Sequence, residues 1–133
     1  MGSITRVAAV LLLPALVLAA VATIAAAGEV ATFDTKLTIS SNAPAFHGKV
    51  KSDSDLCVAD RKIKLYRKRR GSAPRKLLGE DRSNGNGFWA ITEPDDFTLK
   101  SGIYFAKTRK ILDQSTPLPT FCERDKTRKL VVD

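Results

Sequence analysis

Residues 61–83 read RKIKLYRKRRGSAPRKLLGEDRS, and apolar and basic side chains alternate along the first part of this stretch. In an extended strand over Arg61–Arg67, Ile63 and Leu65 lie on one face, and the lysines and tyrosine between them lie on the other. A glycine and a proline then turn the chain into a second strand at residues 76–83. The stretch therefore predicts a β-hairpin with an apolar inner face and a basic outer face.

Short alternating runs of the same kind recur along the rest of the chain, and no segment shows helical periodicity. This pattern is typical of an all-β sandwich or barrel. In the second run, Phe46 and Val50 are expected to point inward, and His47 is expected to face solvent. We predict seven strands, at residues 35–41, 46–52, 61–67, 76–83, 88–92, 102–108 and 127–132.

The sharpest local signal is Asn84-Gly85-Asn86-Gly87, because asparagine and glycine tolerate the positive φ angles of tight turns. It predicts a hairpin between the fourth and fifth strands. In the fifth strand Trp89 and Ile91 are the favoured inward pair, and Phe88 and Ala90 are the alternative.

Residues 1–27 have the pattern of a secretory signal peptide helix. Arg6 is the only charged residue in this segment, a long apolar run follows it, and small residues crowd its end at Ala25–Ala27. Cleavage there leaves one domain of residues 28–133. The alternative is an uncleaved membrane anchor, since the run is long enough to span a bilayer. Pro14 and the alanine-rich second half favour cleavage, so we expect a secreted chain without a membrane span.

The chain has two cysteines, Cys57 and Cys122. In an exported protein such a pair predicts a disulfide. Closing a loop of about 65 residues restricts the unfolded chain by about 4 kcal/mol. A structural zinc site would need further ligands, and His47 is the only histidine. We therefore expect neither a metal site nor a cofactor.

The net charge is +8, and nine Lys or Arg residues with no carboxylate lie between Arg61 and Lys76. Such a field attracts anionic partners: acidic polysaccharide, teichoic-type polymer, anionic lipid headgroups or nucleic acid. Nucleic acid is not expected, since export removes the opportunity and few aromatic residues accompany the run. A solubilising surface is the other interpretation. The candidate anion-binding residues are Lys62, Lys64, Arg67, Lys68, Arg69, Arg70, Arg75 and Lys76.

No catalytic motif is evident. A serine hydrolase needs a nucleophile, a base and an orienting group, and the chain has no Gly-x-Ser-x-Gly elbow. No glycine loop has the spacing that cradles phosphate. The acidic pairs Asp53/Asp55 and Asp95/Asp96 lack the regular run of oxygen ligands of calcium loops, and solvation is their expected role.

Residues 46–108 resemble the transthyretin-like, carboxypeptidase-regulatory-like group of extracellular domains. The resemblance rests on Phe46-x-Gly48-x-Val50, on Lys64-Leu65-Tyr66-Arg67, on Gly87 before Phe88-Trp89, and on Gly102-x-Tyr104. It implies a seven-stranded Greek-key sandwich of the immunoglobulin/transthyretin type, used as a structural or recognition module. Transthyretin-related hydroxyisourate hydrolases use several histidines, an arginine and a C-terminal Tyr-Arg-Gly-Ser signature. This chain has one histidine and ends Leu-Val-Val-Asp.

These observations favour a secreted, non-enzymatic module that contacts an anionic polymer or another protein at the cell surface through its basic hairpin. The alternative is a small hydrolase of the transthyretin-related type that uses His47 with a nearby carboxylate.

Overall fold

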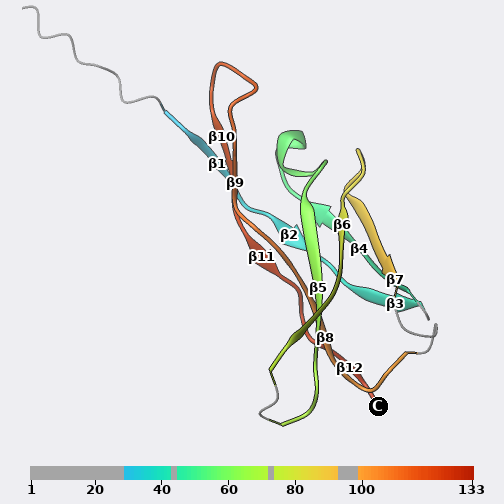
Figure 1. The fold of residues 1–133 in the computed structure, drawn as a ribbon. Coiled ribbons are helices and arrows are strands. Elements are labelled where there is room, and N and C mark those ends of the chain that lie inside the picture. Colours follow the sequence, from blue (N-terminus) through green and yellow to red (C-terminus); the bar gives the residue numbers. More distant parts are fainter. Residues whose placement is uncertain (1–28, 43–44, 72–73, 93–98) are drawn as a thin grey trace, which may run out of the picture.

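The computed structural model describes residues 29–42, 45–71, 74–92 and 99–133. These residues form an all-β protein of twelve strands and one short 3₁₀ turn (Figure 1). The predicted signal peptide helix at residues 1–27 lies outside the described residues.

The first main sheet carries the predicted hairpin, and we call it the basic sheet. β5 (Lys62–Lys68) and β8 (Gly102–Thr108) form its centre, and β6 (Lys76–Arg82) pairs with the other edge of β5. Two short strands, β11 (Asp125–Lys126) and β12 (Leu130–Val132), share the free edge of β8. All pairings are antiparallel, and the β5–β6 hairpin is confirmed.

The second main sheet contains Trp89, and we call it the tryptophan sheet. β2 (Lys36–Leu37) and β3 (Ser40–Asn42) pair with one edge of β4 (Ala45–Lys51), and β7 (Phe88–Thr92) pairs with the other. The first predicted strand is therefore divided in two.

The two main sheets face each other across one core. Phe46 of the tryptophan sheet stacks on Tyr104 of the basic sheet, with ring centroids 4.4 Å apart. Trp89 and Ile91 are buried and Phe88 is exposed, which confirms the favoured inward pair. The arrangement is consistent with the predicted β-sandwich. The core comprises Leu37, Ile39, Phe46, Val50, Ile63, Leu65, Leu78, Trp89, Ile91, Tyr104 and Ala106.

Carboxylates connect the two sheets on both sides of the core. On one side, Asp81 Oδ2 of β6 accepts a hydrogen bond from the backbone N–H of Ala90 in β7, at 2.8 Å. On the other side, Asp125 Oδ2 of β11 accepts one from the backbone N–H of Leu37 in β2, at 2.7 Å. Edge-strand amides that would otherwise need water are thus satisfied by the opposite sheet.

A third, three-stranded sheet forms an arm at one end of the molecule (Figure 1). β1 (Ala31–Phe33) pairs in parallel with β10 (Thr120–Cys122), which pairs in antiparallel with β9 (Ile111–Asp113). The 3₁₀ turn η1 (Asp55–Cys57) lies beside it, because the predicted disulfide joins Cys57 to Cys122, with Cα atoms 5.4 Å apart. The disulfide prediction is confirmed.

The hairpin predicted at Asn84–Gly87 is wrong, although the tight turn exists. Gly87 has a φ of +86°, and its N–H donates to the carbonyl of Asn84 at 2.9 Å. However, β6 pairs with β5 and β7 pairs with β4, so the turn carries the chain from one sheet to the other. Turn residues set the local angles, whereas longer-range pairing sets the sheet that each strand joins.

The strand count also differs from the predicted seven. The last predicted strand, residues 127–132, forms only β12 at its end, and β11 precedes it. The arm strands β1, β9 and β10 were not predicted, because they are short and two of them flank a proline-containing link.

Candidate functional site

The outer face of the basic sheet carries a row of three lysines in direct cross-strand register. Lys64 of β5 lies opposite Lys107 of β8, and Lys107 lies opposite Lys126 of β11. Adjacent strands are about 4.8 Å apart. Like charges directly opposite each other destabilise a sheet. We call these three residues the lysine row.

An aromatic pair lies next to the lysine row on the same face. Tyr66 and Phe105 are cross-strand partners whose rings stack with centroids 5.5 Å apart. Arg75 lies 4.8 Å from the Tyr66 ring centroid, and Lys126 lies 4.5 Å from that of Phe105. Lys107 approaches both rings, at 5.9 and 5.8 Å. Phe105 is only 4% exposed, because neighbouring side chains cover it. These cation–π contacts hold three cations close together over a rigid surface.

Burial and the positive charges around Lys107 both lower its pKa. Burial is the larger cause, and the charges of Arg75, Lys126 and Arg124 lower the pKa further. Among the described residues, no carboxylate forms an ion pair with Lys107 or Lys126. An anion bound here would relieve this repulsion.

Lys62 and Lys64 of β5 form ion pairs with a carboxylate that lies outside the basic run. Glu80 of β6 pairs with Lys62 at 3.2 Å and with Lys64 at 3.4 Å. The hydrogen bond from Lys62 is the main cause that lowers the pKa of Glu80. Lys62 and Lys64 are therefore partly neutralised.

A hollow of about 430 Å³ opens beside the aromatic pair, and we call it the outer hollow. Its apolar lining residues are Pro74, Ile103 and Phe105. Its cationic lining residues are Lys68, Arg75, Lys126 and Lys129. Among the residues that the structure describes, no carboxylate lines it.

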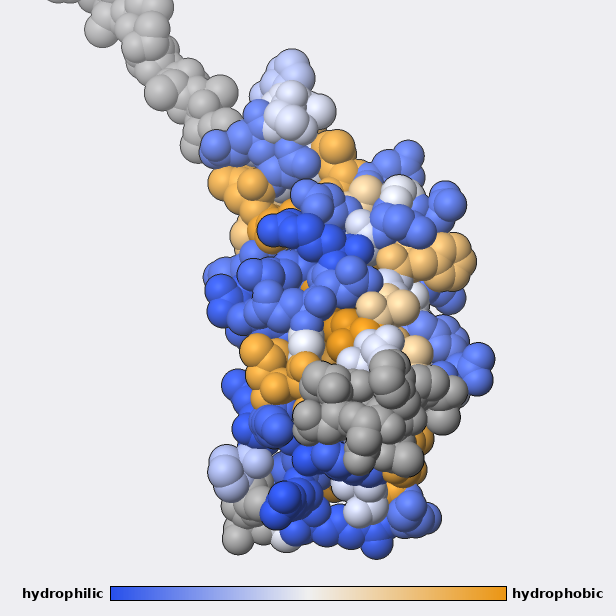
Figure 2. All heavy atoms as spheres, turned by 45° about the vertical axis from the view of Figure 1, so that its right-hand side comes forward, coloured by the Kyte–Doolittle hydropathy of each residue, from blue (hydrophilic) through white to orange (hydrophobic). Residues whose placement is uncertain are grey.

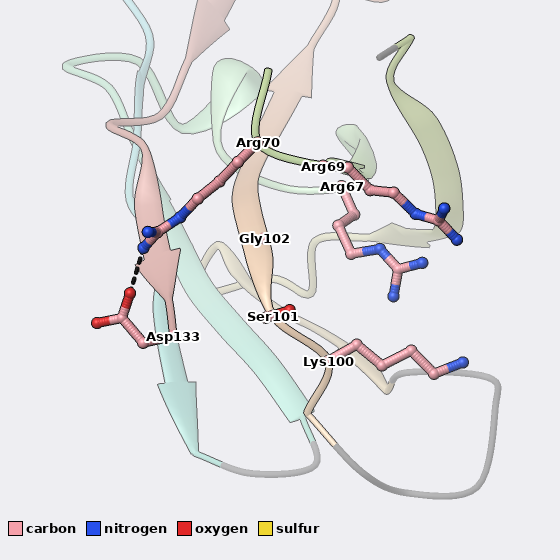
Figure 3. A pocket seen from close by; sticks show the side chains of 7 residues that line it. All are labelled: Arg67, Arg69, Arg70, Lys100, Ser101, Gly102 and Asp133. Atoms are coloured by element: carbon pink, nitrogen blue, oxygen red, sulfur yellow. Dashed lines mark hydrogen bonds and ion pairs between the residues drawn. The ribbon is translucent and has the colours of Figure 1, made fainter. Parts of the chain in front are cut away.

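The residues of the predicted basic run lie at two different places on the surface. Arg67, Arg69 and Arg70 line a second pocket, of about 690 Å³, at the end of β5 (Figure 3). Arg67 is on the inner side of its strand and is 9% exposed. Its side chain extends to the same side as Arg69 and Lys100, whereas Arg70 reaches the opposite way to form an ion pair with Asp133 (Figure 3). The eight predicted residues thus do not form one continuous patch. Lys76 is exposed at the start of β6.

Sequence reasoning missed Lys107, Lys126 and Lys129. They lie about 30 to 55 positions beyond the basic run. The pairing of β8 with β5 and β11 brings Lys107 and Lys126 to the same face, and Lys129 lines the outer hollow. The sequence offered one signal for Lys107, because residues two apart in a strand share a face and Phe105 and Lys107 are two apart.

Arg61, which begins the basic run, is buried and does not contribute to the outer face. Its Nη1 donates to Thr35 Oγ1 at 2.9 Å and to the carbonyl of Cys57 at 3.0 Å. Its Nη2 donates to the carbonyls of Arg109 and Glu123, at 2.7 and 3.0 Å. Burial lowers the pKa of this guanidinium. The side chain joins the body of the molecule to the start of the arm.

His47 is exposed on β4, as predicted, and lines a shallow hollow with Asp81 and Phe88. Both oxygens of Asp81 already accept backbone hydrogen bonds, Oδ1 from Arg82 and Oδ2 from Ala90, at 2.8 Å each. This carboxylate is therefore engaged in structure. No group of three metal-ligating side chains occurs in the described part of the chain.

The side of the molecule on which β6 and β7 come forward is covered mostly by hydrophilic residues, with hydrophobic residues in small separate patches (Figure 2). In the described ranges, no helix has the length and apolar character needed to cross a membrane. No protein-family model and no curated protein matches the chain.

Proposed function

We propose that this chain is a secreted, non-enzymatic β-sandwich module that binds an anionic polymer of the cell surface through the outer face of its basic sheet. The lysine row is the observation that carries the proposal. Lys107 and Lys126 lie in direct register with no carboxylate partner among the described residues, which costs stability, whereas Lys64 is paired with Glu80. Their presence on one face of the sheet, with Arg75 beside them, is explained if they bind multiply charged anions.

Two further observations support parts of the proposal. The disulfide is of the kind that persists in oxidising compartments, which supports secretion. Two facing sheets with Phe46 and Val50 in the core support the β-sandwich, and the transthyretin-like, Greek-key assignment is the proposal made from the sequence. The signal peptide remains a proposal from the sequence pattern.

The test compares two double variants of the chain purified after export. Lys107→Gln/Lys126→Gln removes two charges from the lysine row. Lys36→Gln/Lys51→Gln removes two exposed lysines that are also direct cross-strand partners, but on the tryptophan sheet. Both variants lose the same net charge.

We expect the first variant to bind an acidic polymer about tenfold more weakly at low salt, and the second to change the affinity little. Wild-type binding should weaken as salt rises. Equal weakening by both variants would mean that net charge alone, with no defined site, attracts the polymer.

A further inference from the structure

The outer hollow combines two kinds of surface that a purely electrostatic site does not need. Pro74 and Ile103 supply apolar surface, and the cations Lys68 and Arg75 line the same hollow. A ligand that fits both must present an apolar face as well as negative charge. Polyphosphate and poly(glycerol phosphate) carry the charge but have no ring. A sugar ring that bears a carboxylate has both, since its C–H face packs on apolar side chains while the acid group remains at its edge.

The lysine row adds a direction to this chemistry. Lys64, Lys107 and Lys126 lie on three adjacent strands, about 4.8 Å apart from strand to strand. Ile103 lies on the same outer face of β8 as Lys107 but four residues away, about 13 Å along the strand. A polymer therefore reaches both Lys107 and Ile103 if it runs along β8 over several sugar units.

The row and the outer hollow are continuous, because Lys126 belongs to both. Its ammonium lies over the Phe105 ring, at 4.5 Å from the centroid. One extended ligand can thus contact the charged row and the apolar lining together.

We propose that the anionic partner is an acidic polysaccharide of the uronate type, which runs along β8 from the lysine row into the outer hollow, with carboxylates near Lys107 and Lys126 and a ring against Ile103. This inference rests on the proposed function and specifies its ligand. Lysine ammonium groups supply point charges, and the apolar lining selects polymers that contain rings.

The test uses four charged probes and one neutral probe at a single low salt concentration: polygalacturonate, poly(glycerol phosphate), inorganic polyphosphate, single-stranded DNA and dextran. Affinities are compared per charged group by calorimetry. We expect polygalacturonate to bind most tightly and dextran not to bind.

A matched pair of variants tests the apolar contact. Ile103→Thr removes apolar surface from the outer hollow. Val131→Thr makes a similar change at the direct cross-strand neighbour, which is 58% exposed and does not line the hollow. We expect Ile103→Thr to weaken polygalacturonate binding about fivefold and to leave polyphosphate binding unchanged. Val131→Thr should alter neither, and thermal unfolding should show that both variants fold.

The outcomes separate this inference from the proposed function. If the phosphate polymers bind as tightly as polygalacturonate, and Ile103→Thr has no selective effect, the uronate assignment is overturned and polymer binding stands. Tightest binding of single-stranded DNA would overturn it in favour of nucleic acid. If no charged probe binds, or if dextran binds equally, both the inference and the proposed function fail.

Discussion

The guanidinium of Arg61 donates a hydrogen bond to the backbone carbonyl of Cys57, at 3.0 Å, and Cys57 is one of the two disulfide-bonded residues. The same guanidinium contacts three other segments, and all four acceptors are neutral oxygens. The disulfide and Arg61 therefore act at the same junction between the arm and the two main sheets.

Replacing Arg61 by leucine should be severely destabilising. The side chain is 1% exposed, and its loss leaves buried carbonyl groups without a donor. We expect the free energy of unfolding in urea to fall by about 3 kcal/mol or more. Arg82→Leu is the control, because Arg82 is exposed and its guanidinium contacts Asp60 at the surface, with the carboxylate at 3.3 Å and the carbonyl at 3.2 Å. That variant should lose less than about 1 kcal/mol.

Removing the disulfide should cost about 4 kcal/mol in the loop-entropy description. The double variant Cys57→Ser/Cys122→Ser removes it, and the loss is measured by denaturant unfolding. Wild-type protein in reductant should fall to a similar stability, and the variant should not respond to reductant. Labelling of the denatured, exported wild type should find almost no free thiol. Two reactive thiols per chain would contradict oxidation in the native protein.

Gly48→Ala should prevent normal folding, whereas Gly85→Ala should be tolerated. A Cβ at Gly48 would lie 1.9 Å from the carbonyl oxygen of Thr38 and 2.8 Å from Trp89 Nε1. At Gly85 no atom lies within 4 Å of the added carbon. We expect a loss above about 3 kcal/mol, or insoluble protein, for the first and a change within about 0.5 kcal/mol for the second. Soluble yield and thermal unfolding measure the difference.

Lys107→Met should stabilise the fold and weaken polymer binding. The methionine keeps most of the stem over the aromatic rings while the charge opposite two lysines is removed, so we expect a gain of about 0.2–1 kcal/mol at neutral pH. Lys62→Met is the control. It breaks the ion pair with Glu80, so we expect it to lower the free energy of unfolding rather than raise it.

The pH dependence of stability has a definite sign for Lys107. Because its pKa is lowered on folding, the unfolded chain binds more protons just below the ordinary lysine pKa. The contribution of Lys107 to stability should therefore rise as pH increases through that window, and Lys107→Met should abolish this part of the slope. An identical slope in wild type and variant would show that Lys107 is not perturbed.

His47→Ala should leave the protein unchanged in both stability and chemistry. The side chain is exposed, and the Asp81 carboxylate that shares its hollow is held by two backbone amides. We expect no hydrolysis of cyclic amides or esters above the buffer rate for either protein. A measurable activity that disappears in His47→Ala would establish the hydrolase alternative.

The parts of the fold that depend on local alternation could be predicted from the sequence. β5, β7 and β8 agree with their predicted positions to within one residue, and the inward pair Trp89 and Ile91 is confirmed. Two-residue periodicity reports which face of a strand is buried, and these strands are long enough to show it.

The remaining features depend on contacts that no local pattern encodes. The turn at Asn84–Gly87 is real, but the residues of the turn do not specify that β6 and β7 join different sheets. The lysine row exists only because β8 pairs in a particular register with β5 and β11. The burial of Arg61 likewise depends on acceptors in Thr35, Arg109 and Glu123, which are 26, 48 and 62 residues away in sequence.

The hydrogen bonds from Ala90 and Leu37 to Asp81 and Asp125 have a consequence for behaviour at high concentration. An outer strand whose amides are already satisfied is a poor template for a strand from another molecule. A foreign strand that added to β2 or β7 would therefore first have to break one of these bonds to the opposite sheet, which disfavours pairing at these two strands.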